Sequence, residues 1–499
     1  MKKTAALLLV FALILTMFAA CNGSGGQTGS STAPSSEASA SSEETPAPSE
    51  ESSEAPSEET PTGGITLTFA QEQVTDEEST AFLETLLAEY EELSGNTIKY
   101  EGIPESDYRT WLTTQFTAGT GPAVYTSILH DATSDYNKGW IMNFGELYEA
   151  ESKYDSGKAW KDTLPESILE RMYISPEKDV PGYPTSTSVV RIFCNMDLFR
   201  QAGVEQPENW AEFMEACAAL KEAEVTPFAF PNATIADLSW LWFNNSVSSQ
   251  VNSGLLEKVD VSGNGYAELN EMCKAMADGT WDFDVPELKA GYELMKDFSQ
   301  YWTSDYNSLD RTTAIEMFLR GDAAMIQALS GDLRMIDEMA EFEYAVMPVP
   351  VITTDTTEYA QNLSVVLGGQ PNTIYSISKS LSDEEQAAAI DFVQWMSSPD
   401  VQARYAEAIY RIPLATSVEL PEKLAGFIIT EDQLRLNYYA GINEQIRNYF
   451  HRAGQQYLEG TITVDEMCKI LNESYQEVLG QIATENEWTA ENNYKIGEE

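Results

Sequence analysis

The sequence predicts an α/β protein of at least two domains with a mainly helical C-terminal part. The chain has 499 residues, and its hydrophobic fraction of 43% is that of a globular protein large enough for more than one core. Amphipathic helices alternate with short apolar strands in the first half of the folded region, which favours parallel strand pairing. From Ser382 onward, helix-start signals recur with little strand pattern between them.

The first unit of this pattern begins with an alternating strand from Ile65 to Phe69. A capping box from Thr75 to Glu78 then predicts a helix that ends at Gly95. Thr97 to Ile103 is predicted as the second strand, and a further helix leads to a third apolar strand from Ala123 to Leu129. These repeated strand and helix units predict a parallel α/β lobe.

A second series begins with a predicted strand from Val189 to Cys194, and Asn209 caps the helix that follows it. The aromatic stretch from Asp237 to Val247 fits either a strand or the start of a helix. Later strands are predicted at 323–329, 344–349 and 375–377, and later helix starts at Ser382, Ser398, Thr430 and Thr463.

The charge balance excludes several classes of protein. There are 29 Lys and Arg residues against 80 Asp and Glu residues, a net charge of −51. The sequence has no Lys/Arg cluster beyond its first three residues from which a nucleic-acid-binding face could form. The two histidines, His130 and His451, are too few and too far apart for zinc motifs or most histidine-dependent triads. Excess negative charge favours neutral or cationic ligands.

The first 20 residues predict a signal peptide, with two lysines ahead of a short apolar run. The run ends in Phe18-Ala-Ala-Cys21, which resembles a bacterial lipobox and implies that Cys21 carries the lipid. Residues 22–63 contain eight glutamates and no aromatic or basic residue, a composition typical of a disordered tether. We therefore expect a protein held at the outer face of the cytoplasmic membrane only through its lipid anchor.

Four stretches together resemble the extracellular solute-binding proteins of family 1, the sugar-type binding proteins of ABC importers. The stretches agree with the family in order and spacing: they are Tyr183-Pro184 with 193–213, Phe318 to Met325 with Gly331, Met347 to Pro350, and Ile377 to Ser380 with 387–402. The chain departs from the family at Pro122-Ala123, where Pro-Asp is common, and at Asp332-Leu333, where a Trp often follows the glycine. The absence of a Trp after Gly331 removes one ring on which a sugar could stack.

The resemblance implies a two-lobe periplasmic-binding-protein-like fold joined by hinge strands, with ligand captured between the lobes. It assigns 65–187 and 328–375 to lobe one, and 188–327 and 376–499 to lobe two. Hinge crossings are expected near 186–190, 325–329 and 375–377. The implied protein is a monomer that passes a neutral sugar or oligosaccharide to ABC permease subunits, without catalysis and without a cofactor.

The ligand-site candidates combine aromatic rings with polar groups at strand ends, because a sugar presents both a C–H face and hydroxyls. Trp242 and then Trp240 are the candidate stacking rings, although either could be a core residue. Loops after strand carboxyl ends bind ligands in open sheets, which points to Glu72, His130 and Asp131. The further candidates at the hinge and in the late loop are Tyr183, Asp332 and Arg411.

Three alternatives remain open at this level. The segment Asp260 to Glu271 fits an EF-hand calcium loop, but Ser262 and Ala267 weaken the match, and a turn before a helix explains it as well. Four cysteines after Cys21 permit disulfides without requiring them. The competing functions are a glycan-binding surface protein with no transporter and, less favoured, a two-carboxylate glycosidase.

Overall fold

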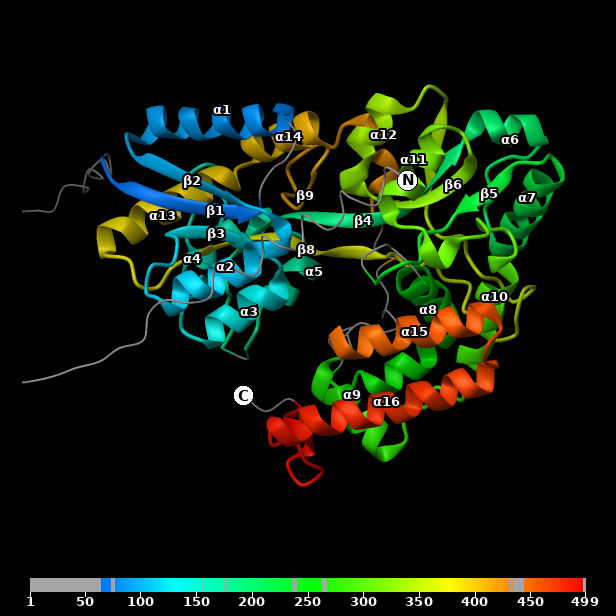
Figure 1. Ribbon diagram of the computed structural model, residues 1–499. Helices are drawn as coiled ribbons and strands as arrows, with labels where there is room; N and C mark the ends of the chain where they lie inside the picture. The colour runs from blue at the N-terminus through cyan, green and yellow to red at the C-terminus, as the bar shows by residue number, and fades with distance from the viewer. Residues whose placement is uncertain are drawn as a thin grey trace, which may run out of the picture. The chain divides into compact units, whose positions relative to one another are not determined.

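Nine strands within the described part of the chain join in one mixed sheet (Figure 1). The computed structural model describes residues 64–496 apart from 73–76, 156, 176, 236–239, 263–266, 430–432 and 434–443, and all of these belong to one compact unit. The strands are β1 (Thr66–Glu72), β2 (Thr97–Ile103), β3 (Val124–Ser127), β4 (Tyr183–Asn195), β5 (Thr226–Ala229), β6 (Ala323–Leu329), β7 (Tyr344–Met347), β8 (Gly368–Ile377) and β9 (Ile412–Pro413).

The strand order is β2-β1-β3-β8-β4-β6-β5, with β7 and β9 also paired to β4. Strand β1 pairs in parallel with β2 and β3, as the strand and helix alternation predicted. Strand β8 is antiparallel to both β3 and β4, so the long strands β4 and β8 connect the two ends of the sheet. The predicted α/β class is confirmed.

Helices cover the sheet and form most of the chain after β9. They are α1 (Glu77–Ser94), α2 (Glu105–Thr117), α3 (Leu129–Asn137), α4 (Gly145–Glu149), α5 (Glu166–Met172), α6 (Met196–Ala202), α7 (Trp210–Glu222), α8 (Trp240–Val259), α9 (Leu269–Asp278), α10 (Pro286–Ser299), α11 (Arg311–Leu319), α12 (Leu333–Met339), α13 (Asp383–Met396), α14 (Pro399–Ile409), α15 (Glu444–Glu459) and α16 (Val464–Glu485). Short 3₁₀ turns include η1 (Trp160–Thr163) and η3 (Ser330–Asp332).

Several helix starts have the caps that the sequence predicted. Asn209 accepts a backbone hydrogen bond at the start of α7, and Ser398 does so at the start of α14, where Pro399 occupies the first turn. Ser382 and Thr463 form full capping boxes with the glutamates three residues on. The aromatic stretch near Trp240 is helical rather than extended. The predicted signals at Thr75 and Thr430 lie outside the described residues, as does everything before residue 64.

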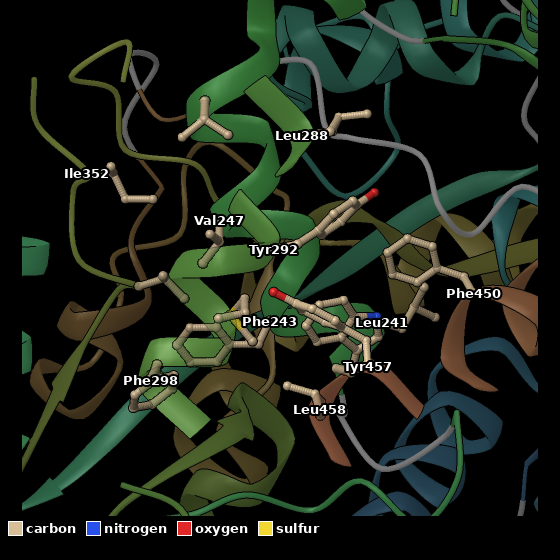
Figure 2. Close-up of a cluster of buried hydrophobic side chains, with 14 of the residues drawn as sticks. Leu241, Phe243, Val247, Leu288, Tyr292, Phe298, Ile352, Phe450, Tyr457 and Leu458 are labelled. Carbon is tan, nitrogen blue, oxygen red and sulfur yellow. The ribbon is translucent and has the colours of Figure 1, made fainter. Parts of the chain in front are cut away.

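The buried side chains divide into two main cores. The first core surrounds β1 and β3 and includes Phe69, Val124 and Tyr183. The second core surrounds β4 to β7 and the C-terminal helices; it comprises one aromatic-rich cluster around Phe243 and Phe298 and a neighbouring cluster around Phe193 and Phe318. Figure 2 shows part of the aromatic-rich cluster, where side chains of α8, α10 and α15 meet.

Two segments pack differently from the predicted division into lobes. Helices α13 and α14 were expected in lobe two, but Phe392, Trp395 and Val401 are buried in the first core. Residues 328–375 were expected in lobe one, but Ile336 and Ile352 within this range are buried in the second core. The apolar faces of these segments are compatible with either core, and only the tertiary path of the chain selects between them.

Three segments pass between the two cores. Strand β4 runs from Tyr183 in the first core to Ile192 in the second, strand β8 returns, and Ile412 to Leu414 passes a third time through β9. The expected crossing at 325–329 is wrong, because the apolar residues of β6 from Ala323 to Ala328 are buried in the second core. The β4–β8 ladder shifts register three times between Pro184 and Val189, so its regular pairing is interrupted where the chain passes between the cores.

Candidate functional site

A cavity of about 700 Å³ opens beside the strands that pass between the two cores. Its wall comes from the end of β1, the β3–α3 connection and α2, together with the middle of β4 and β8, the η3–α12 segment and the α14–β9 connection. The lining includes Gln71, Glu72, Ser79, Tyr108, Arg109, Leu112, Thr126, Ser127, Ile128, Asp131, Ser186, Thr187, Ser188, Ser330, Gly331, Arg334, Met335, Glu338, Asn372, Thr373, Ile409, Tyr410, Arg411 and Ile412. Both cores therefore contribute to it.

Three of the predicted site residues line this cavity. Glu72 is the last residue of β1, and Asp131 lies in the first turn of α3, directly after β3. Arg411 follows α14, where Tyr410 adopts a left-handed conformation with φ of 53° and turns the chain toward β9. The carboxyl ends of β1 and β3 thus bring polar side chains to one edge of the sheet, as expected for an open α/β sheet.

Arg109 is a cavity residue that the sequence did not single out. Its two terminal nitrogens donate to Asp135, at 2.7 Å and 2.5 Å, and its Nε lies 3.6 Å from Asp131. Asp135 has no exposed side-chain surface and also accepts a 2.7 Å hydrogen bond from the Tyr125 hydroxyl. The hydrogen bond with Asp135 raises the pKa of Arg109, while burial and the same carboxylate raise the pKa of Tyr125.

Arg334 of α12 is a second cavity arginine with acidic neighbours. Its Nη1 donates to Ser79 at 2.6 Å, its Nε donates to Glu338 at 2.9 Å, and its Nη2 lies 3.4 Å from Glu78. These contacts join a helix of the second core to α1 of the first. Arg411 differs, because its guanidinium lies over the ring of Tyr405, 4.6 Å from the centroid.

Hydroxyl and amide groups make up much of the remaining polar wall. Ser186 and Thr187 of β4 bond across to β8, the first to the Thr373 hydroxyl at 2.8 Å and the second to the Gln370 carbonyl at 2.9 Å. Asn372 adds an amide from the same strand. Such groups both donate and accept hydrogen bonds, which suits a ligand that itself carries hydroxyls.

Tyr183 and Asp332 have structural roles, contrary to the prediction. Tyr183 is 1% exposed and stacks on Trp160 with ring centroids 4.4 Å apart, and burial raises the pKa of its hydroxyl. Asp332 forms an ion pair with Arg311 and accepts a 2.8 Å hydrogen bond from the Leu329 backbone. Neither side chain lines the cavity. His130 is exposed and also lies outside the lining.

The two candidate tryptophans occupy different environments. Trp240 has no exposed surface and lies among Tyr292, Phe450 and Tyr457, so its assignment to a ligand-stacking role is wrong for this conformation. Trp242 is only partly buried; it packs against the aromatic-rich cluster and against Val190 of β4 and Leu367, the residue before β8. It is outside the cavity lining, but it contacts residues of the β4 and β8 segments that pass between the cores.

The proposed calcium loop is only partly described, since residues 263–266 fall outside the structure's described ranges. Its last residue, Glu271, is 1% exposed and accepts backbone hydrogen bonds from Ser262 at 2.7 Å and Glu268 at 2.9 Å. One carboxylate oxygen thereby caps α9, and the other accepts from the loop before it. Among the described residues, no group of three or more His, Cys, Asp or Glu side chains is placed to hold a metal ion.

The four cysteines after Cys21 are buried free thiols, which answers the open question of disulfides for this conformation. Burial raises the pKa of all four thiols; for Cys273 and Cys468 the value is about 12. No helix in the described ranges is long and apolar enough to cross a membrane. Cys21 itself lies outside the described residues.

Two cores joined by three crossing segments, with a cavity at the crossings, define a two-lobe binding protein. Residues 75–403 match the family model for bacterial extracellular solute-binding proteins, and the chain belongs to that family. This confirms the resemblance on which the predicted fold rested.

Curated relatives share limited identity with the chain. It is 21% identical over 318 residues to the sn-glycerol-3-phosphate-binding periplasmic protein UgpB of Brucella abortus (strain 2308), covering 62% of this chain and 64% of that protein. The UgpB protein of Yersinia enterocolitica is 23% identical over 253 residues, covering 49% of this chain and 51% of the relative. The chain thus matches less than two thirds of the length of these relatives.

Solved structures resemble this chain over most of its length. A chitin oligosaccharide binding protein superposes with a TM-score of 0.64 at 20% identity, covering 83% of this chain and 99% of that one. RafE from Streptococcus pneumoniae gives 0.62 at 18% identity, covering 84% and 99%. The GacH receptor of Streptomyces glaucescens, solved without ligand and with acarbose, gives 0.62 at 17% identity, covering 83% and 98%. At these identities the likeness establishes the fold.

Proposed function

We propose that this protein captures a neutral sugar or oligosaccharide in the cavity and delivers it to the permease of an ABC importer. The observation that carries the proposal is the composition of the cavity wall, which combines hydroxyl and amide groups with two arginines, Arg109 and Arg334, that already have carboxylate partners. A sugar hydroxyl both donates and accepts, so Glu72 and Asp131 would accept from it while Asn372 would do both.

Trp242 supplies the remaining feature of a sugar site, an apolar ring. It is partly exposed beside the crossing strands, and a closing movement of the second core toward the first would bring its face over a ligand in the cavity. The names of the structural neighbours support the same ligand class, since they are linked to chitin oligosaccharide, raffinose and acarbose. The curated relatives, named for sn-glycerol-3-phosphate, make a phosphorylated polyol the second candidate.

The proposed setting is the cell surface. Lipidation of Cys21 would hold the protein at the outer face of the cytoplasmic membrane, and the acidic segment after it would let the folded part reach a permease. Members of this family are binding proteins, so we expect capture without turnover. A glycan-binding surface protein without a transporter has the same cavity and differs only in lacking the permease partner.

The test is a thermal-shift screen of the purified folded part against neutral mono- and oligosaccharides, with sn-glycerol 3-phosphate in parallel. A ligand present at 100 times its Kd should raise the free energy of unfolding by about 2.7 kcal/mol. Chromatography of the same mixtures should show no product. Release of a shortened sugar would refute the proposal in favour of a glycosidase, and failure to co-purify with a permease from membranes would favour the transporter-free alternative.

A further inference from the structure

The cavity contains three arginines, and two of them share a feature that bears on ligand charge. Arg109 has Asp131 and Asp135 within ion-pair distance, and Arg334 has Glu78 and Glu338. In each case one guanidinium faces two carboxylates. Lys138 Nζ also lies 3.5 Å from Asp135. With Glu72 added, five carboxylates lie in or near the site against three guanidinium groups and this one ammonium group.

The geometry at Arg109 shows how the surrounding carboxylates balance the charge of the guanidinium. Asp135 is fully buried and engages both terminal nitrogens from behind, which fixes the plane of the guanidinium. Asp131 lies beside Nε on the cavity side, with 30% of its side chain exposed. A ligand approaching Arg109 therefore meets a negative group next to the positive one.

Arg334 repeats the arrangement from the other core. Ser79 and Glu338 occupy its Nη1 and Nε, and Glu338 lines the cavity with 53% of its side chain exposed. A phosphate needs donors whose positive charge is not already balanced, because its desolvation cost is large. Arg109 and Arg334 would each have to give up a carboxylate contact before binding a phosphate, whereas Arg411 lies over the ring of Tyr405.

We infer that the paired carboxylates at Arg109 and Arg334 are specificity-determining: they make the cavity reject phosphorylated polyols and accept neutral ones. The inference rests on the proposed function and deepens it, since it separates this chain from the ligand for which its curated relatives are named. Asp131 and Glu338 act directly, because they line the cavity beside the guanidinium groups. Asp135 is a positioning residue that acts through Arg109.

The experiment uses the Asp131→Asn and Glu338→Gln variants, alone and combined. Both side chains are partly exposed, and each substitution keeps the shape of the side chain while removing its charge. Asp135 is left intact because its loss would leave Arg109 and Tyr125 without their buried acceptor. The matched control is Glu316→Gln. Glu316 forms an exposed ion pair with Arg320, four residues later on the chain, and neither residue lines the cavity.

The probes are inorganic phosphate, sn-glycerol 3-phosphate and glycerol, measured by calorimetry at low salt. Wild type and Glu316→Gln should show no heat of phosphate binding at millimolar concentration. Removal of each cavity carboxylate should tighten binding of both phosphates roughly tenfold, and added salt should weaken the gain. Glycerol binding should not change.

The outcomes separate the two claims. Tight binding of sn-glycerol 3-phosphate by the wild type, or no phosphate response in the double variant, overturns the specificity inference. A phosphate response in the double variant with no neutral saccharide bound by the wild type supports the specificity inference and refutes the proposed sugar function. Equal responses in Glu316→Gln and the cavity variants would show a general charge effect and also overturn it.

Discussion

Replacement of Trp240 by alanine should destabilise the protein strongly, because this indole joins three helices in the second core. Its ring lies 5.9 Å from Phe450 and from Tyr292 and 6.3 Å from Tyr457, measured between centroids. Figure 2 shows these three partners in the cluster, reaching in from α10 and α15. Trp240 has no exposed surface, so the substitution creates a buried cavity that its rigid aromatic neighbours cannot fill.

The expected loss is about 3–5 kcal/mol in the free energy of unfolding. For a folded unit of this size the entropy of unfolding is roughly 0.9 kcal/mol per kelvin, so Tm should fall by about 3–6 °C. The assay is urea denaturation followed by circular dichroism, with calorimetry for Tm. Trp242→Ala, two residues away on the same helix, is the matched control and should change Tm by less than half as much.

Gly454 of α15 provides an independent check on the same contact. A Cβ at this position would lie 2.2 Å from Nε1 of Trp240, so Gly454→Ala should also be destabilising. In the Trp240→Ala background the added methyl group enters the cavity, and the second substitution should cost little or nothing. Additive losses in the double variant, or a Trp240→Ala protein within about 1 kcal/mol of wild type, would refute the assignment of Trp240 to the core.

Three further expectations follow from the site, the thiols and the N-terminal segment. Trp242→Ala should weaken binding of the ligand found in the saccharide screen by about 1–3 kcal/mol, measured by calorimetry, and unchanged affinity would remove Trp242 from the site. At pH 8 the four cysteines of the folded part should resist Ellman's reagent, because burial raises their pKa and keeps them as thiols; the fraction of reactive thiolate grows only as pH rises toward the raised value, and full labelling should need urea. Prompt labelling of native protein would contradict the buried positions. Cys21→Ser should release the protein into the medium with an unchanged melting curve, whereas retention in the membrane fraction would count against the lipid anchor.

The charge of the cavity illustrates how the site depends on side chains that the sequence separates. Arg109 lies on α2, a helix that the sequence predicted from its apolar residues. Asp135 follows 26 residues later, and nothing in the local sequence pattern links the two. An ion pair between a buried carboxylate and an arginine on another helix leaves no hydrophobic periodicity in the sequence from which it could be predicted. Glu72 and Asp131 were predictable because both directly follow strands that end at the same sheet edge.

The sequence by itself determined the elements of this protein, because helix caps, strand alternation and turn residues are encoded by neighbouring positions. The capping boxes at Ser382 and Thr463 and the strands β1, β2 and β6 stand where the pattern placed them. Composition also counted against nucleic-acid binders and zinc enzymes, and the resemblance of four stretches indicated the binding-protein family.

Only the tertiary structure decided which core each element joins and which polar side chains meet. Helices α13 and α14 carry apolar faces that could pack on either core; α13 packs on β1 and β8 of the first core, and α14 packs on α1 and α13. The sequence pattern does not distinguish Trp240 from Trp242, yet Trp240 is fully buried in the second core, whereas Trp242 lies at its edge and also contacts the crossing segments. The physical reason is that burial and ion pairing arise between segments far apart in the chain, and residue spacing along the sequence carries no record of which of them come together.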